Sequence, residues 1–162
     1  MSQQSAPPMP QPTAEHKNLE EYAGNWKVAC KFYMDPSQPP METQATETVE
    51  MVGDFWTVSR YESSMMGMPF QGRATLGYEP HTGKYVSTWI DSCSPALFRL
   101  TGTIQGDTLT MTGDAWSCMT NSVLKHRTTE KRINKNERVF EMFCTMPDGK
   151  EIKIMTNHYK RA

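Results

Sequence analysis

Residues 64–92 decide the fold of this chain. They read SMMGMPFQG over 64–72, GYEPHTGKY over 77–85 and STWIDS over 87–92. Aromatic and β-branched residues are frequent on both sides of the turn-forming run Glu79-Pro80-His81-Thr82-Gly83, as expected for strands joined by a tight connection. The stretch therefore predicts two antiparallel strands, entered through a bend at Gly67-Met68-Pro69.

The same pattern continues from Gly24 to the end of the chain. Runs rich in Thr, Val, Tyr, Phe and Trp alternate with short clusters of Pro, Gly, Asp and Asn, which favours strands over helices. Four of these clusters have the composition of hairpin turns: Gly53-Asp54, Gln105-Gly106-Asp107, Asn134-Lys135-Asn136 and Pro147-Asp148-Gly149. The predicted strands are 25–34, 43–52, 55–63, 70–78, 84–91, 97–104, 107–113, 122–133, 137–145 and 150–160.

Sequential hairpins without helical crossovers predict an all-β, up-and-down antiparallel meander. Roughly ten strands in one flat sheet would leave two open edges, and closure into a barrel removes them. We therefore expect a single antiparallel β-barrel, with a two-sheet sandwich as the alternative. Larger barrels of this kind keep an internal cavity that can hold a small ligand.

The N-terminal residues differ in composition from the rest. Residues 1–12 are mostly Ser, Gln and Pro, which predicts a disordered tail because such a segment buries too little apolar surface to order itself. Thr13 is a suitable N-cap for a short helix over 14–23, which Gly24 ends. Residues 13–162 are then one barrel domain.

Composition and charge exclude several classes of function. The formal net charge is −1, from 17 basic and 18 acidic residues without runs, which disfavours a nucleic-acid partner. No apolar stretch is long enough for a membrane-spanning helix, and Met1–Pro12 lacks the features of a signal peptide, so we expect a cytoplasmic protein. Cys30, Cys93, Cys118 and Cys144 are far apart in sequence, which predicts reduced thiols rather than a disulfide or zinc framework.

Gly24-Asn25-Trp26, following a short helix and opening the first long strand, resembles the signature of lipocalins and other calycins. In that superfamily the tryptophan closes one end of the barrel and an arginine near the chain end packs on it. The resemblance implies this barrel-closing role for Trp26, with Arg161 or Arg132 as its partner.

Several blocks also resemble an uncharacterised bacterial lipocalin-like family, domain-of-unknown-function family 1579. The resemblance covers residues 19–161 and implies a calycin-type barrel without an established reaction. It rests on these blocks: Met65-Met66-Gly67, Pro69-Phe70, Gly72, Gly77-Tyr78, Gly83-Lys84-Tyr85, Trp89, Asp91-Ser92, Thr110 with Thr112-Gly113, Val139-Phe140-Glu141-Met142 and Pro147-Asp148-Gly149-Lys150-Glu151. The loop around Cys93 and Ser94-Pro95 departs from the family pattern.

Strand periodicity selects the candidate ligand-binding residues, because alternate side chains of each strand line a barrel. On strand 84–91 the mixed aromatic and polar set is predicted to face inward, and Val86, Thr88 and Ile90 outward. Aromatic and methionine residues of other strands complete the predicted lining of a site for a small, mostly apolar ligand. The alternative is that the methionines only fill gaps in the core. The predicted lining residues are Tyr61, Met65, Met66, Phe70, Tyr78, Tyr85, Ser87, Trp89, Asp91, Met142 and Met155.

Asp91 is the only acid in that set. If it is buried it needs a partner, for which Arg99 and Arg127 are candidates, and it can then act as the acid or base of an isomerase or hydrolase. The alternative is a rim aspartate that caps the turn at Ser92. A third interpretation is an interaction module without a ligand, in which apolar outward strand faces pair two barrels as a homodimer.

The positions of the histidines decide whether a haem or metal cofactor is expected. His16 is expected on an exposed helix and His81 in a turn, whereas His126 and His158 lie on strands, where a haem-binding calycin places its ligand. We interpret His158 as facing outward. No group of metal-ligating residues at close spacing and no phosphate-binding loop occurs. The sequence predicts no cofactor, with haem as the alternative.

Overall fold

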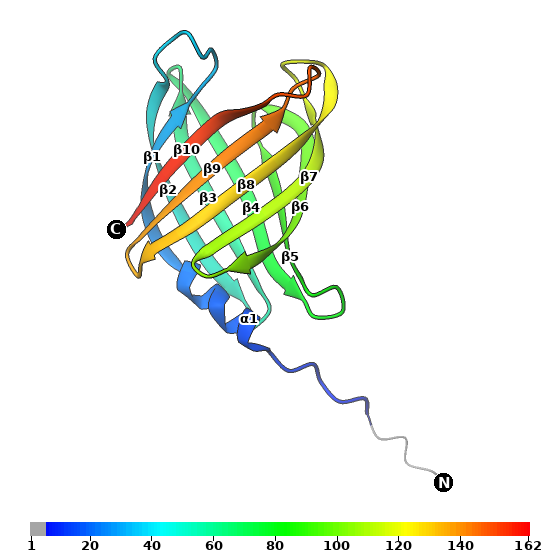
Figure 1. Ribbon diagram of the computed structural model, residues 1–162. Helices are drawn as coiled ribbons and strands as arrows, with labels where there is room; N and C mark the ends of the chain where they lie inside the picture. Colours follow the sequence, from blue (N-terminus) through cyan, green and yellow to red (C-terminus); the bar gives the residue numbers. More distant parts are fainter. Residues whose placement is uncertain (1–5) are drawn as a thin grey trace.

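A computed structural model describes residues 6–162 as a closed antiparallel β-barrel with a short helical segment at one end (Figure 1). The helical segment consists of α1 (Ala14–Asn18) and the 3-10 turn η1 (Leu19–Tyr22). The strands are β1 (Gly24–Phe32), β2 (Met41–Val52), β3 (Trp56–Met65), β4 (Met68–Glu79), β5 (Lys84–Asp91), β6 (Ser94–Gln105), β7 (Thr108–Ser117), β8 (Ser122–Asn134), β9 (Glu137–Thr145) and β10 (Glu151–Arg161).

The predicted meander is confirmed. Each strand pairs with its sequence neighbours, and β1 pairs with β10 to close the ring. All ten predicted strands are present, and the sandwich alternative is wrong because no free edge remains. The four predicted hairpin turns connect β2 to β3, β6 to β7, β8 to β9, and β9 to β10. Of the predicted tail, residues 1–5 lie outside the described part of the chain, and residues 6–12 are irregular.

The helical segment covers one end of the barrel, which we call the closed end (Figure 1). Here α1 contacts β4, and η1 contacts β2 and β3. Against expectation, His16 is only 2% exposed. Its Nδ1 accepts a hydrogen bond from the backbone N–H of Thr13 at 2.9 Å, and its Nε2 lies 2.9 Å from the Tyr78 carbonyl. The expected exposure of His16 is wrong because helix periodicity does not reveal that its imidazole bonds to the backbone of a strand.

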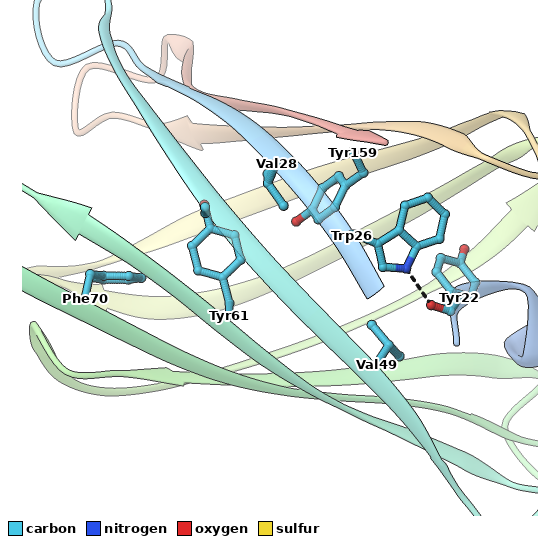
Figure 2. Packing of buried hydrophobic residues seen from close by; sticks show 8 residues of the cluster. Tyr22, Trp26, Val28, Val49, Tyr61, Phe70 and Tyr159 are labelled. Atoms are coloured by element: carbon cyan, nitrogen blue, oxygen red, sulfur yellow. Dashed lines mark hydrogen bonds between the residues drawn. The ribbon is translucent and has the colours of Figure 1, made fainter. Parts of the chain in front are cut away.

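Trp26 closes this end as the resemblance implied. Its indole Nε1 donates to the Tyr22 carbonyl at 2.9 Å (Figure 2), and the ring packs edge-on against Tyr159. Of the two arginines expected on it, Arg161 is the one found, with its Cζ 4.2 Å from the Trp26 ring centre. Arg161 also donates to the Ala23 carbonyl at 2.7 Å, so it ties the chain end to the start of β1.

The opposite end, which we call the open end, carries the β1–β2, β3–β4, β5–β6, β7–β8 and β9–β10 connections (Figure 1). Several of these expose methionine: Met34, Met66, Met68 and Met119 are all at least 66% exposed. The β3–β4 turn consists of Met66 and Gly67, both with positive φ, which is the geometry of a tight two-residue hairpin. Within residues 6–162, no helix is both long enough and apolar enough to cross a bilayer.

Candidate functional site in the barrel interior

Three aromatic rings from adjacent strands form one wall of the interior. Tyr61 on β3 packs edge-on against Phe70 on β4 and Trp89 on β5, at centroid distances of 6.1 and 5.8 Å, and Phe70 stacks on Trp89. Gly72 makes room for this arrangement, because a Cβ at that position would lie 2.0 Å from Cη2 of Trp89. The wall therefore depends on a residue without a side chain.

Several other inward-facing side chains around the barrel are only half-buried. Met142 on β9 and Met155 on β10 are cross-strand partners, and Met155 is also paired with Phe32 on β1. Ser87 is opposite Leu76, which packs against the core from the inner face. These side chains point into the barrel and remain partly accessible to solvent. This inner, half-buried region contains Met65, Leu76, Ser87, Trp89, Phe140, Met142 and Met155.

Three of the predicted lining residues lie elsewhere. Tyr78 packs against His16 and Tyr85 beneath the helix, and the buried Tyr85 belongs to the closed-end core with Leu19. Both tyrosines are inward-facing, but the helix covers them. Met66 is 83% exposed in the β3–β4 turn and lies on the rim. Strand periodicity assigns a face but not a height along the barrel.

Asp91 holds the wall in place at the open end. Its Oδ2 accepts a hydrogen bond from Trp89 Nε1 at 2.8 Å, and its Oδ1 accepts one from the backbone N–H of Cys93 at 2.9 Å. These contacts cap the β5–β6 turn and orient the Trp89 ring. Neither expected arginine is its partner, since Arg127 pairs with Glu151 at 2.6 Å and Arg99 is exposed. The geometry gives Asp91 a positioning role.

A buried ionic cluster, which the sequence analysis missed, lies toward the closed end. Arg138 on β9 pairs with Glu47 on β2 at 2.6 Å and with Glu130 on β8 at 2.7 Å. Its guanidinium also lies 3.9 Å from the Tyr159 ring centre and 4.6 Å from that of Trp26. Burial raises the pKa of Glu47, and Arg138 opposes that shift. With two carboxylates for one guanidinium, the cluster leaves no cation free for an anionic ligand.

A signal for this cluster is present in the sequence. Glu47 shares the inward phase of β2 with Ala45 and Val49, and Arg138 shares that of β9 with Phe140 and Met142. Opposite charges in the apolar phases of two strands predict a buried pair, because a lone buried charge is too costly. A small cavity of about 10 Å³, lined by Tyr22, Trp26, Glu130 and Arg138 among others, adjoins the cluster.

The two strand histidines lie on opposite faces. His158 is exposed, in the outward position predicted for it. His126 on β8 is buried, packs edge-on against Phe98, and its Nδ1 lies 3.0 Å from the Leu124 carbonyl. Burial lowers the pKa of His126, which favours the neutral ring at pH 7. Among the described residues, no three His, Cys, Asp or Glu side chains are close enough together to hold a metal ion.

The closed meander, the capping helix and the Trp26–Arg161 contact define a calycin-type barrel. The family model described as "Protein of unknown function (DUF1579)" matches residues 11–161, so the chain belongs to this family. Among proteins with curated descriptions, none matches this chain in sequence.

Two solved structures share the fold at low sequence identity. Rv2717c from M. tuberculosis is 13% identical, with a TM-score of 0.65 over 94% of this chain and 99% of that one. The S-type phycobiliprotein lyase CPES from Guillardia theta is 12% identical, with a TM-score of 0.61 over 93% of this chain and 98% of that one. At these identities the likeness establishes the fold alone.

Proposed function

We propose that this protein binds a small, mostly apolar molecule inside the barrel, against the aromatic wall and the half-buried side chains around it. One observation carries the proposal: large apolar side chains such as Phe140, Met142 and Trp89 point inward and yet are only half-buried. Phe140 and Trp89 pack against the buried core on one side and keep part of their surface accessible, which a bound apolar molecule would cover. Here they form a lining of the kind that ligand sites use.

The two ends of the barrel fit this function. The helix and the Trp26 cluster close one end, so a ligand enters from the other. At that end the connections and the first residue of β4 expose Met34, Met66, Met68 and Met119. Methionine side chains are flexible and polarisable, and they adapt to apolar ligands of irregular shape. A barrel of the same fold is a phycobiliprotein lyase by its name, which is compatible with a ligand-handling barrel.

The test is binding of the neutral fluorophore N-phenyl-1-naphthylamine, whose emission rises in an apolar environment. We expect saturable binding to the wild type. The Ser87→Phe variant places a ring on the inner face of β5 and should weaken binding about tenfold or more, because it occupies the ligand's space.

The matched control is Thr88→Phe, one residue further along the same strand. Thr88 lies on the outer face, where its hydroxyl contacts that of Thr75 at 2.6 Å, so this variant should bind the fluorophore like the wild type. Absence of saturable binding to the folded wild type, or equal weakening by both variants, would contradict the proposal.

A further inference from the structure

The barrel interior contains a buried polar atom that has no hydrogen-bond partner among residues 6–162. Asn157 on β10 is 4% exposed, and its Oδ1 accepts no hydrogen bond. Its Nδ2 donates to the Tyr159 hydroxyl at 3.3 Å. Exchanging the two amide atoms would leave Nδ2 unpaired instead, so one polar atom of this side chain lacks a partner in either orientation. Leaving a buried acceptor unpaired is costly.

The surroundings of Asn157 are polar on one side and apolar on the other. Its cross-strand partners are Cys30 on β1 and Phe140 on β9. Burial raises the pKa of Cys30 to about 11, and the nearby Tyr61 hydroxyl opposes this shift. Figure 2 shows the ring of Tyr159 extending from β10 toward Tyr61 on β3. We call Cys30, Tyr61, Asn157 and Tyr159 the polar ring of the barrel.

The polar ring lies between the ionic cluster and the proposed ligand space. Tyr159 stacks on the guanidinium of Arg138 on one side. Two residues before Asn157 on β10, Met155 faces the half-buried region together with Met142. Phe140 is the cross-strand partner of Asn157, so a ligand that lies against Phe140 and Met155 has the polar ring next to its innermost atoms.

We infer that the Asn157 amide keeps the orientation in which Oδ1 is unpaired, that the polar ring binds the head group of the ligand, and that this head group is an uncharged hydrogen-bond donor such as a hydroxyl or an amide. The inference rests on the proposed function. Asn157 Oδ1 accepts the donor's hydrogen, and the tyrosine hydroxyls supply donors for its lone pairs. A carboxylate head is disfavoured because it has no hydrogen to donate and because Glu47 and Glu130 outnumber Arg138 nearby.

Two isomers separate this inference from simple apolar binding. Octan-1-ol and 1-methoxyheptane have the same atoms, but only the alcohol carries an O–H donor. An apolar cavity without a partner for that donor favours the ether, because burying an unpaired hydroxyl is costly. We expect the alcohol to displace N-phenyl-1-naphthylamine from the wild type at about tenfold lower concentration than the ether, and octanoate to displace it more weakly than the alcohol.

Asn157→Leu removes the acceptor at nearly constant volume and should abolish the preference for the alcohol while retaining fluorophore binding. His158→Leu, at the adjacent outward-facing position, should keep the preference. Equal displacement by the alcohol and the ether in the wild type, or tightest displacement by octanoate, would overturn the inference even though fluorophore binding persisted. Failure of the fluorophore to bind at all would instead overturn the proposed function on which the inference rests.

Discussion

At the scale of single residues, glycine and aspartate determine where the aromatic wall stands. Gly72 allows the indole of Trp89 to lie directly over the β4 backbone, and Asp91 fixes the edge of that indole through its Nε1. Neither residue forms the lining itself. Both residues stood out in the sequence. The need for glycine at position 72 could not be predicted, because it depends on which side chain of the neighbouring strand lies over that position.

Gly72→Ala should therefore displace Trp89 and lower the stability of the barrel. The added methyl group would overlap the ring, and overpacking of this kind costs about 1–3 kcal/mol. Thermal unfolding followed by tryptophan fluorescence should show a lower Tm and a shifted native emission spectrum. Gln71→Ala, at the adjacent exposed position, serves as the control. An unchanged Tm and spectrum for Gly72→Ala would contradict the packing described for the wall.

Two of the four cysteine thiols should react with an alkylating reagent, and the other two should be protected. Cys93 and Cys118 are exposed, whereas Cys30 and Cys144 are buried. Burial also raises the pKa of Cys30 to about 11 and raises the pKa of Cys144, so their nucleophilic thiolate forms are scarce at pH 8. Brief alkylation of the native protein with iodoacetamide, followed by mass spectrometry of peptides, should modify the first pair only. Rapid modification of Cys30 would show that its environment is open.

At the scale of elements, turn chemistry predicted the strands well, and strand periodicity predicted the interior only in part. Ten strands could be found because Gly, Pro, Asp or Asn occurs in nearly all of the connections between strands. The sequence could not predict that Met142 is accessible inside the barrel while Tyr85 is covered, because both residues lie at inward-facing positions of their strands. The difference depends on the stagger of the strands and on the end that the helix covers.

His16 attaches the helical segment to the barrel. Its imidazole bonds both the helix start and the Tyr78 carbonyl on β4, and it packs against Phe55 and Tyr78. We expect His16→Ala to destabilise the fold by about 2–4 kcal/mol, because it removes a packed ring and leaves a buried carbonyl unpaired. Chemical unfolding measures this loss. Lys17→Ala, at an exposed position on the same helix, should change the stability by less than about 0.5 kcal/mol. Equal effects of the two variants would contradict the attachment.

At the scale of the whole molecule, the barrel combines a polar, ionic closed half with an apolar, accessible open half. Glu47, Glu130 and Arg138 join β2, β8 and β9 across the closed half, while methionine and aromatic side chains line the other. We propose above that the ligand occupies the accessible half.

Stability should fall on mild acidification because of His126. Burial lowers the pKa of this imidazole, so the unfolded chain takes up a proton near pH 6.5 that the folded chain resists. The free energy of unfolding should accordingly decrease as the pH falls below about 6.5. His126→Gln should show a smaller decrease in Tm between pH 7.5 and 5.5 than the wild type, and His158→Gln should behave like the wild type. The comparison cancels the opposite contribution of Glu47, whose pKa is raised. Parallel pH profiles for all three proteins would contradict the burial of His126.

The most direct measurement of ligand binding inside the barrel is NMR of protein labelled with ¹³C at the methionine methyl groups, titrated with N-phenyl-1-naphthylamine. The aromatic rings of the probe shift the signals of nearby methyl groups. The account predicts the largest shifts for the inner Met65, Met142 and Met155, and none for Met9, which is exposed on the N-terminal segment. Shifts confined to the exposed Met34, Met66, Met68 and Met119, with the inner methionines unchanged at saturation, would show that the probe binds outside the barrel and would contradict the central claim.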